Sequence, residues 1–105
     1  MIASETLRET VAIYVRHGWL LRRILATESG EKLNEFGVPV VQSSLDAAWF
    51  SRPPGDGAVA WEIRYLGDSP FALVEFLDES DPDFEQNLDH VEQRLAESVA
   101  KRKAA

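Results

Sequence analysis

The chain contains no cysteine and no long apolar run. The absence of cysteine excludes disulfide bonds, thiolate nucleophiles and thiolate zinc ligands, and it is compatible with a reducing compartment. No segment approaches the roughly 18 apolar residues that a membrane span requires, and the first ten residues lack the basic and apolar regions of a signal peptide. We therefore expect a cytoplasmic protein that does not interact with a membrane.

Basic residues are also scarce, with 11 Lys and Arg against 18 Asp and Glu, for a net charge of −7. This charge repels the phosphate backbone, so we expect no nucleic-acid partner. The only histidines, His17 and His90, form neither an H-x-x-x-H nor an H-E-x-x-H pattern. The Gly55-Asp56-Gly57 segment lacks the lysine and the following serine or threonine of a phosphate loop. The sequence therefore predicts neither a metal nor a cofactor.

The length of 105 residues, with 45% hydrophobic content, is sufficient for one domain spanning residues 1–105. The N-terminal segment predicts a helix from about Ser4 to His17, because its apolar residues recur at spacings of three and four. Gly18, between two basic residues and the apolar Trp19, is typical of a helix end.

Short strands are predicted in the middle of the chain. Residues 19–26 form the first, with a continuation of the first helix as the alternative, and residues 27–42 form a connecting loop with at most one helical turn. Three further apolar runs, at residues 45–52, 58–66 and 71–77, are separated by the turn-forming segments PPGDG and GDSP. Such short connections predict antiparallel neighbours.

The last element is predicted as a helix that Asp81 caps and Pro82 begins. One stripe along this helix is apolar and comprises Phe84, Leu88, Val91, Leu95 and Val99. The expected fold class is therefore α+β, an antiparallel β-meander of three to four strands with the N- and C-terminal helices packed on one face.

The pairing of the strands follows from the loops if both loops are symmetric. Trp49 then lies opposite Trp61, and Glu62 lies opposite Glu75. Both tryptophans belong to the face that the helices cover, where large aromatic side chains are usually buried. The opposite face is expected to carry apolar and charged side chains together, at Asp46, Phe50, Glu62, Arg64, Phe71, Leu73, Glu75 and Leu77.

An exposed apolar sheet face is typical of an interaction surface. We therefore predict a small acidic binding or adaptor module, homodimeric or bound to a protein partner, that is not an enzyme. Its interface comprises the apolar anchors Phe50, Phe71, Leu73 and Leu77, with Asp46, Glu62, Arg64 and Glu75 setting the register. There are two alternatives to an interface. Either these apolar residues lie apart from one another on the surface, or residues 27–44 cover them.

The second hypothesis for function is a small hydrolase or isomerase. Glu62 and Glu75 are its candidate catalytic residues, because two carboxylates directly opposite on a sheet discourage joint ionisation. A raised carboxyl pKa of this kind is what a general acid requires.

Overall fold

The computed structural model describes residues 4–28, 30–53 and 59–104, and it shows an α+β fold with a five-stranded sheet. The elements are the helices α1 (Ser4–Arg16) and α2 (Phe84–Ala104), the 3-10 helix η1 (Glu31–Phe36), and the strands β1 (Leu20–Ala26), β2 (Val40–Gln42), β3 (Ala47–Arg52), β4 (Val59–Tyr65) and β5 (Phe71–Leu77). The strand order is β2-β1-β3-β4-β5. Neither helix has a stretch that is both long and apolar enough to cross a bilayer, as far as the chain is described.

The end of α1 is a local motif that the sequence indicated. Gly18 has a left-handed backbone, with φ of 88°, which glycine adopts without steric cost. Its N–H donates to the carbonyl of Val15, and the N–H of Trp19 donates to the carbonyl of Tyr14, both at 3.0 Å. Trp19 also contacts the Tyr14 ring edge-on. These are the bonds and the apolar contact of a Schellman motif, so the predicted helix end and the following strand are confirmed.

The sheet is mixed, and the prediction of a three- to four-stranded antiparallel meander was wrong in this respect. β2, which lies in the segment predicted as a loop, pairs in parallel with β1, while the other neighbours pair antiparallel. Pro39, which cannot donate to a ladder, lies just before β2, and its carbonyl accepts a hydrogen bond from Ile24 N–H at 2.9 Å. β2 is an edge strand of three residues, too short to give a recognisable pattern.

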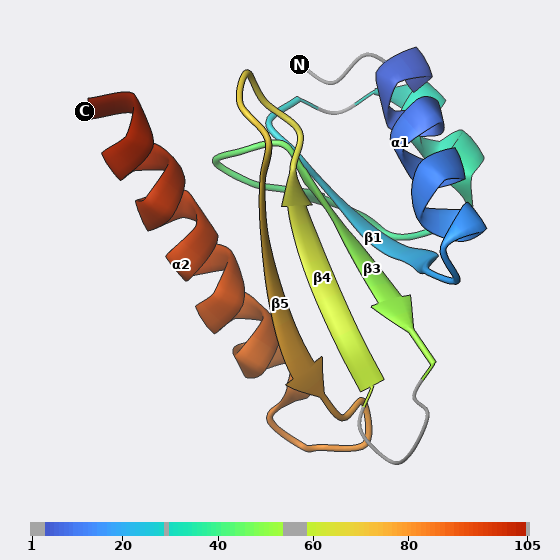
Figure 1. The fold of residues 1–105 in the computed structure, drawn as a ribbon, viewed down its shortest axis with the longest axis vertical. Coiled ribbons are helices and arrows are strands. Elements are labelled where there is room, and N and C mark those ends of the chain that lie inside the picture. Colours follow the sequence, from blue (N-terminus) through green and yellow to red (C-terminus); the bar gives the residue numbers. More distant parts are fainter. Residues whose placement is uncertain (1–3, 29, 54–58, 105) are drawn as a thin grey trace.

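The two helices cover opposite faces of the sheet, as Figure 1 shows with α1 on one side and α2 on the other. The prediction that both pack on one face was therefore wrong. The reason is that β3 is buried along both of its faces from Ala47 to Ser51, which requires cover on each side. α1 and η1 cover one face with Leu7, Tyr14 and Leu33.

The core on the α2 side follows the predicted apolar stripe of that helix. Leu88, Val91, Leu95 and Val99 are buried there, and Phe84 packs at the margin. The sheet contributes residues including Leu25, Ala47, Trp49, Trp61, Ile63 and Tyr65. The predicted inward orientation of both tryptophans is confirmed. α2 begins at Phe84, slightly later than predicted, and Asp81 accepts a hydrogen bond from the Asp83 N–H at 2.9 Å in the preceding turn.

β1 contains a β-bulge, so its side chains do not alternate regularly between the two faces of the sheet. Leu21 pairs with Phe50 and Arg23 pairs with Trp49, so one extra residue, Arg22, lies between two consecutive pairs. Such a bulge turns neighbouring side chains toward the same face. Arg22 and Arg23 both reach partners on the α2 side of the sheet, Ser51 and Glu85 respectively.

The pairing of β3 with β4 differs from the prediction by two residues. Trp49 pairs with Ile63 rather than with Trp61, and residues 54–57 of the predicted PPGDG turn lie outside the described residues. A shift of two residues preserves the faces, because side chains alternate with a period of two. The indoles of Trp49 and Trp61 therefore stay in contact, with ring centroids 6.1 Å apart.

The pairing of β4 with β5 differs by one residue, which reverses the faces of β5. Tyr65 pairs with Phe71, and Glu62 pairs with Val74. The shift arises at Leu66, which has no partner on β5. Its N–H continues the pairing of β4 with β3 by donating to the carbonyl of Asp46 at 2.9 Å, and its side chain packs with the α1 core. The loop that joins the strands is thus one residue longer at this end than the GDSP turn alone.

Candidate functional site

The predicted carboxylate pair does not form. Because β5 is shifted by one residue, Glu62 lies on the α1 side of the sheet and Glu75 lies on the α2 side, where Trp61 is its pairing partner. Glu75 there accepts a hydrogen bond from Arg94 of α2 at 2.5 Å. The predicted pairing of Glu62 with Glu75, on which the hydrolase or isomerase hypothesis was based, was therefore wrong.

The predicted apolar anchors are also placed differently. Phe50 is on the predicted face but is fully buried, because Tyr14 of α1 stacks on it with ring centroids 3.9 Å apart. Phe71, Leu73 and Leu77 lie on the opposite face and pack against the α2 core. These four side chains therefore contribute to the two cores and do not form an exposed surface.

The charged residues of the predicted interface have local partners. Asp46 accepts hydrogen bonds from the backbone N–H and the hydroxyl of Thr27, at 2.8 and 3.1 Å. Arg64 keeps its predicted face, and its guanidinium carbon lies 6.0 Å from the centroid of the Tyr14 ring. Asp46 thus anchors the end of β1, while Arg64 stays beside α1.

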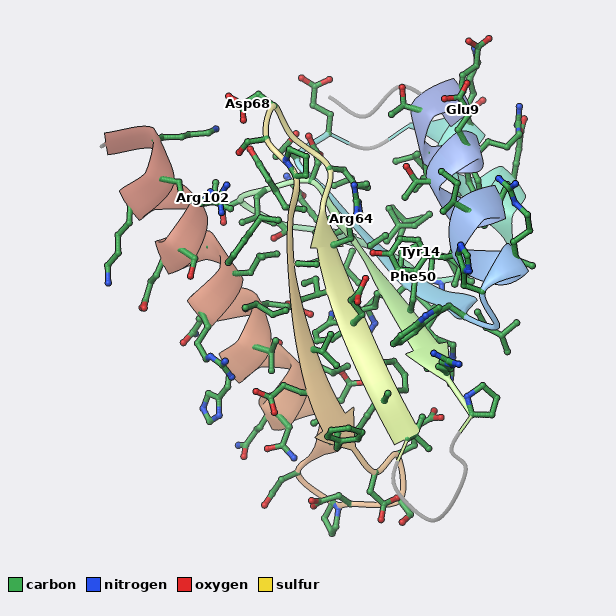
Figure 2. The ribbon with its side chains drawn as sticks, in the orientation of Figure 1. Glu9, Tyr14, Phe50, Arg64, Asp68 and Arg102 are labelled. Carbon is green, nitrogen blue, oxygen red and sulfur yellow. The ribbon has the colours of Figure 1, made fainter. Side chains whose placement is uncertain are left out.

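Tyr14, Glu62 and Arg64 form a polar cluster where α1 meets β4, and Figure 2 shows Tyr14 and Phe50 side by side with Arg64 close to them. The Tyr14 hydroxyl donates a hydrogen bond to the Glu62 carboxylate. Burial, together with the hydrogen bond to Glu62, raises the pKa of Tyr14 to about 12, and Arg64 opposes part of this shift. The phenol is thus held as a donor, which fixes the position of the carboxylate.

We expect this cluster to make the protein less stable at high pH. The unfolded chain ionises Tyr14 near pH 10, while the folded chain keeps the proton to about pH 12. The stability is therefore complete below pH 10 and falls between pH 10 and pH 12, by up to about 2 to 3 kcal/mol. Urea unfolding at several pH values tests this for the wild type and Tyr14→Phe, and an equal loss in both proteins would contradict it.

A second partly buried carboxylate lies on the α2 side. Glu92 accepts a hydrogen bond from the indole N–H of Trp49 at 2.8 Å. Burial raises the pKa of Glu92, and the bond from Trp49 opposes this. Its role in the structure is to satisfy the only polar atom of a fully buried indole.

Metal-binding chemistry has no support in the described chain. No group of three or more His, Asp or Glu side chains is arranged to hold a metal ion among residues 4–28, 30–53 and 59–104. His17 and His90 are both exposed.

Among the described residues, an exposed apolar surface lies on the α1-side face of β5 and continues onto the partly exposed end of β4. α1 lies beside β1 and β3 and does not extend over these two strands (Figure 1). Phe76 is 70% exposed and Val74 is 50% exposed, and the smaller Ala60 and Ala72 belong to the same face. We refer to Ala60, Ala72, Val74 and Phe76 as the open strip, and Glu62 and Arg64 border it on β4.

Sequence reasoning missed Val74 and Phe76, because the assumed four-residue loop assigned them to the buried face. The run FALVEFL is apolar on both of its faces except for Glu75. This carboxylate is typical of an exposed face, but here it lies on the α2 side because Arg94 pairs with it.

Comparisons with known proteins add no assignment: no protein-family model, no curated protein and no solved structure matches this chain.

Proposed function

We propose that this protein is a binding module that pairs with a second copy of itself along the outer edge of β5. The observation that carries the proposal is the composition of this strand. β5 is one of the two edge strands of the described sheet, and its seven residues, FALVEFL, contain no lysine and no proline. Proteins usually protect an edge strand with such residues, because its free N–H and C=O groups are a template for another strand.

The charge on β5 does not protect the edge either. Glu75 is its only charged residue, and Arg94 of α2 holds it on the face turned away from the open strip. The remaining six residues are apolar. A second strand that approaches the edge therefore meets backbone groups flanked by apolar side chains, which favours β-augmentation.

The open strip supports a second copy of this chain as the occupant. In an antiparallel pair of β5 strands with a two-fold axis at Val74, Phe76 of each copy lies across from Ala72 of the other. A large side chain then packs beside a small one at both ends of the strand, with two valines between them. The same sequence thus provides both sides of the contact.

We expect size-exclusion chromatography with light scattering to show a dimer whose proportion rises with concentration. Phe76→Asp places a charge at each end of the strand pair and should yield a monomer. Because each copy carries a net charge of −7, added salt should strengthen the dimer by screening their repulsion.

Val41→Asp is the matched control. Val41 is an exposed valine on β2, the strand at the other edge of the sheet, so it receives the same kind of change away from β5. This variant should dimerise like the wild type. A wild-type protein that stays monomeric at high concentration would contradict the proposal, as would equal loss of dimer in both variants.

A further inference from the structure

A cavity of about 470 Å³ lies between the start of β1, the chain that leads into β2, and the N-terminal end of α2. Its size falls in the range of small-molecule sites. Its lining combines apolar and charged groups, with Trp61, Phe84 and Leu88 on the apolar side and Arg22 and Arg23 as the cations. This cavity is separate from the open strip and does not depend on the proposed dimer.

The bulge in β1 is what brings both arginines to the cavity. The Arg22 guanidinium donates to the Ser51 hydroxyl at 2.9 Å, and its central carbon lies 4.6 Å from the centroid of the Trp61 ring. Arg23 donates through two nitrogens to Glu85, at 2.8 and 3.1 Å. The two cationic groups are therefore held in place by neighbouring elements.

The arginines are better buried than the carboxylates that pair with them. Arg22 is 32% exposed against 51% for its partner Glu79, and Arg23 is 20% exposed against 69% for Glu85. An ion pair with an exposed carboxylate is weak, because solvent and salt screen the charges and the long side chain loses conformational entropy when the pair forms. Water therefore replaces such a carboxylate easily. A carboxylate on a ligand can take the same position.

The indole N–H of Trp61 adds an independent sign of a ligand. Trp61 is 3% exposed, and its Nε1 has no hydrogen-bond partner among the residues that the structure describes. A buried donor without an acceptor loses its hydrogen bonds to water and gains none in return, so such groups are usually satisfied. This donor belongs to a residue that lines the cavity.

We propose that the cavity binds a small molecule that has a carboxylate and a flat apolar body. The carboxylate pairs with Arg22 and Arg23 in place of the side chains of Glu79 and Glu85. The flat body packs against Phe84 and Leu88. The side chains around Trp61 move on binding so that an oxygen of the ligand accepts the indole N–H, which is buried in the unbound chain. No covalent step is involved.

The test is an NMR titration of the full chain with benzoate as the probe, observed at the three indole N–H signals. Trp61→Phe identifies the Trp61 signal by its disappearance. We expect benzoate to shift this signal saturably at millimolar concentration, while benzamide, which has the same shape and no charge, binds about tenfold or more weakly.

Arg22→Gln should weaken benzoate binding by about tenfold or more, since it removes a charged donor and leaves the apolar lining in place. Arg8→Gln is the matched control, because Arg8 also pairs with one glutamate, Glu35, but on the α1 side. It should bind benzoate like the wild type. An unmoved Trp61 signal, equal binding of benzamide, or equal binding by Arg22→Gln would each overturn the proposal.

Discussion

Replacing Trp61 with alanine is expected to lower the free energy of unfolding by about 3 to 5 kcal/mol. The indole is 3% exposed and contacts Trp49 and Phe84 edge-on, with ring centroids 6.1 and 5.2 Å away. The change removes both contacts and leaves a void under the N-terminal end of α2. Against a typical domain stability of about 5 to 15 kcal/mol, this loss is large enough to unfold part of the population at 37 °C.

Urea unfolding followed by circular dichroism measures this change, with Trp61→Phe as the control. Phenylalanine keeps an aromatic ring against Phe84 and removes the unpartnered N–H, so we expect a cost of only about 1 kcal/mol. A cost for Trp61→Ala below about 1 kcal/mol would mean that the ring is not buried.

The second large effect is expected at Phe50, which sequence reasoning placed on an exposed face. Phe50 is fully buried and stacks with Tyr14, so Phe50→Ala removes core contacts between β3 and α1. We expect a cost of about 3 to 5 kcal/mol, measured by the same unfolding experiment. The loss should appear mainly as loosening of α1, because Tyr14 then has no ring beneath it.

Phe76→Ala is the control for this prediction, since the side chain is of the same type on a neighbouring part of the same face. Phe76 is mostly exposed, so its replacement should change the stability of the monomer by no more than about 0.5 kcal/mol. Similar costs at the two positions would contradict the arrangement in which α1 covers β3 and leaves β5 open.

The sequence predicts correctly those helices and strands that are determined by residues close to one another in the chain. Gly18 and the residues around it determine the end of α1 through hydrogen bonds within six residues of chain. The apolar stripe of α2 and the bounds of β5 follow from periodicity and from the polar residues that flank them.

The register of β5 could not be predicted in this way, because it depends on a contact distant in sequence. Leu66 continues the pairing of β4 with β3 by bonding to Asp46, twenty residues earlier in the chain, and packs with the α1 core, so it takes no partner on β5. Turn composition does not encode that contact. A single residue in the loop then moves Val74 and Phe76 from the core to the surface, and it separates Glu62 from Glu75.

The sequence does contain a feature that predicts on which face of the sheet α1 packs. Four consecutive apolar residues, Ala47 to Phe50, are typical of a strand buried on both faces, and such a strand needs a helix on each side. An alternating interpretation of the same residues instead predicts that both helices pack on the face of the tryptophans.

The register between β4 and β5 is the claim on which the open strip and the proposed dimer both depend, and cross-strand NOEs between backbone protons measure it directly. We predict contacts that pair Glu62 with Val74 and Ile63 with Leu73. Contacts that pair Glu62 with Glu75 and Ile63 with Val74 would contradict the account, because Phe76 would then be inside the core and the edge of β5 would present a different face.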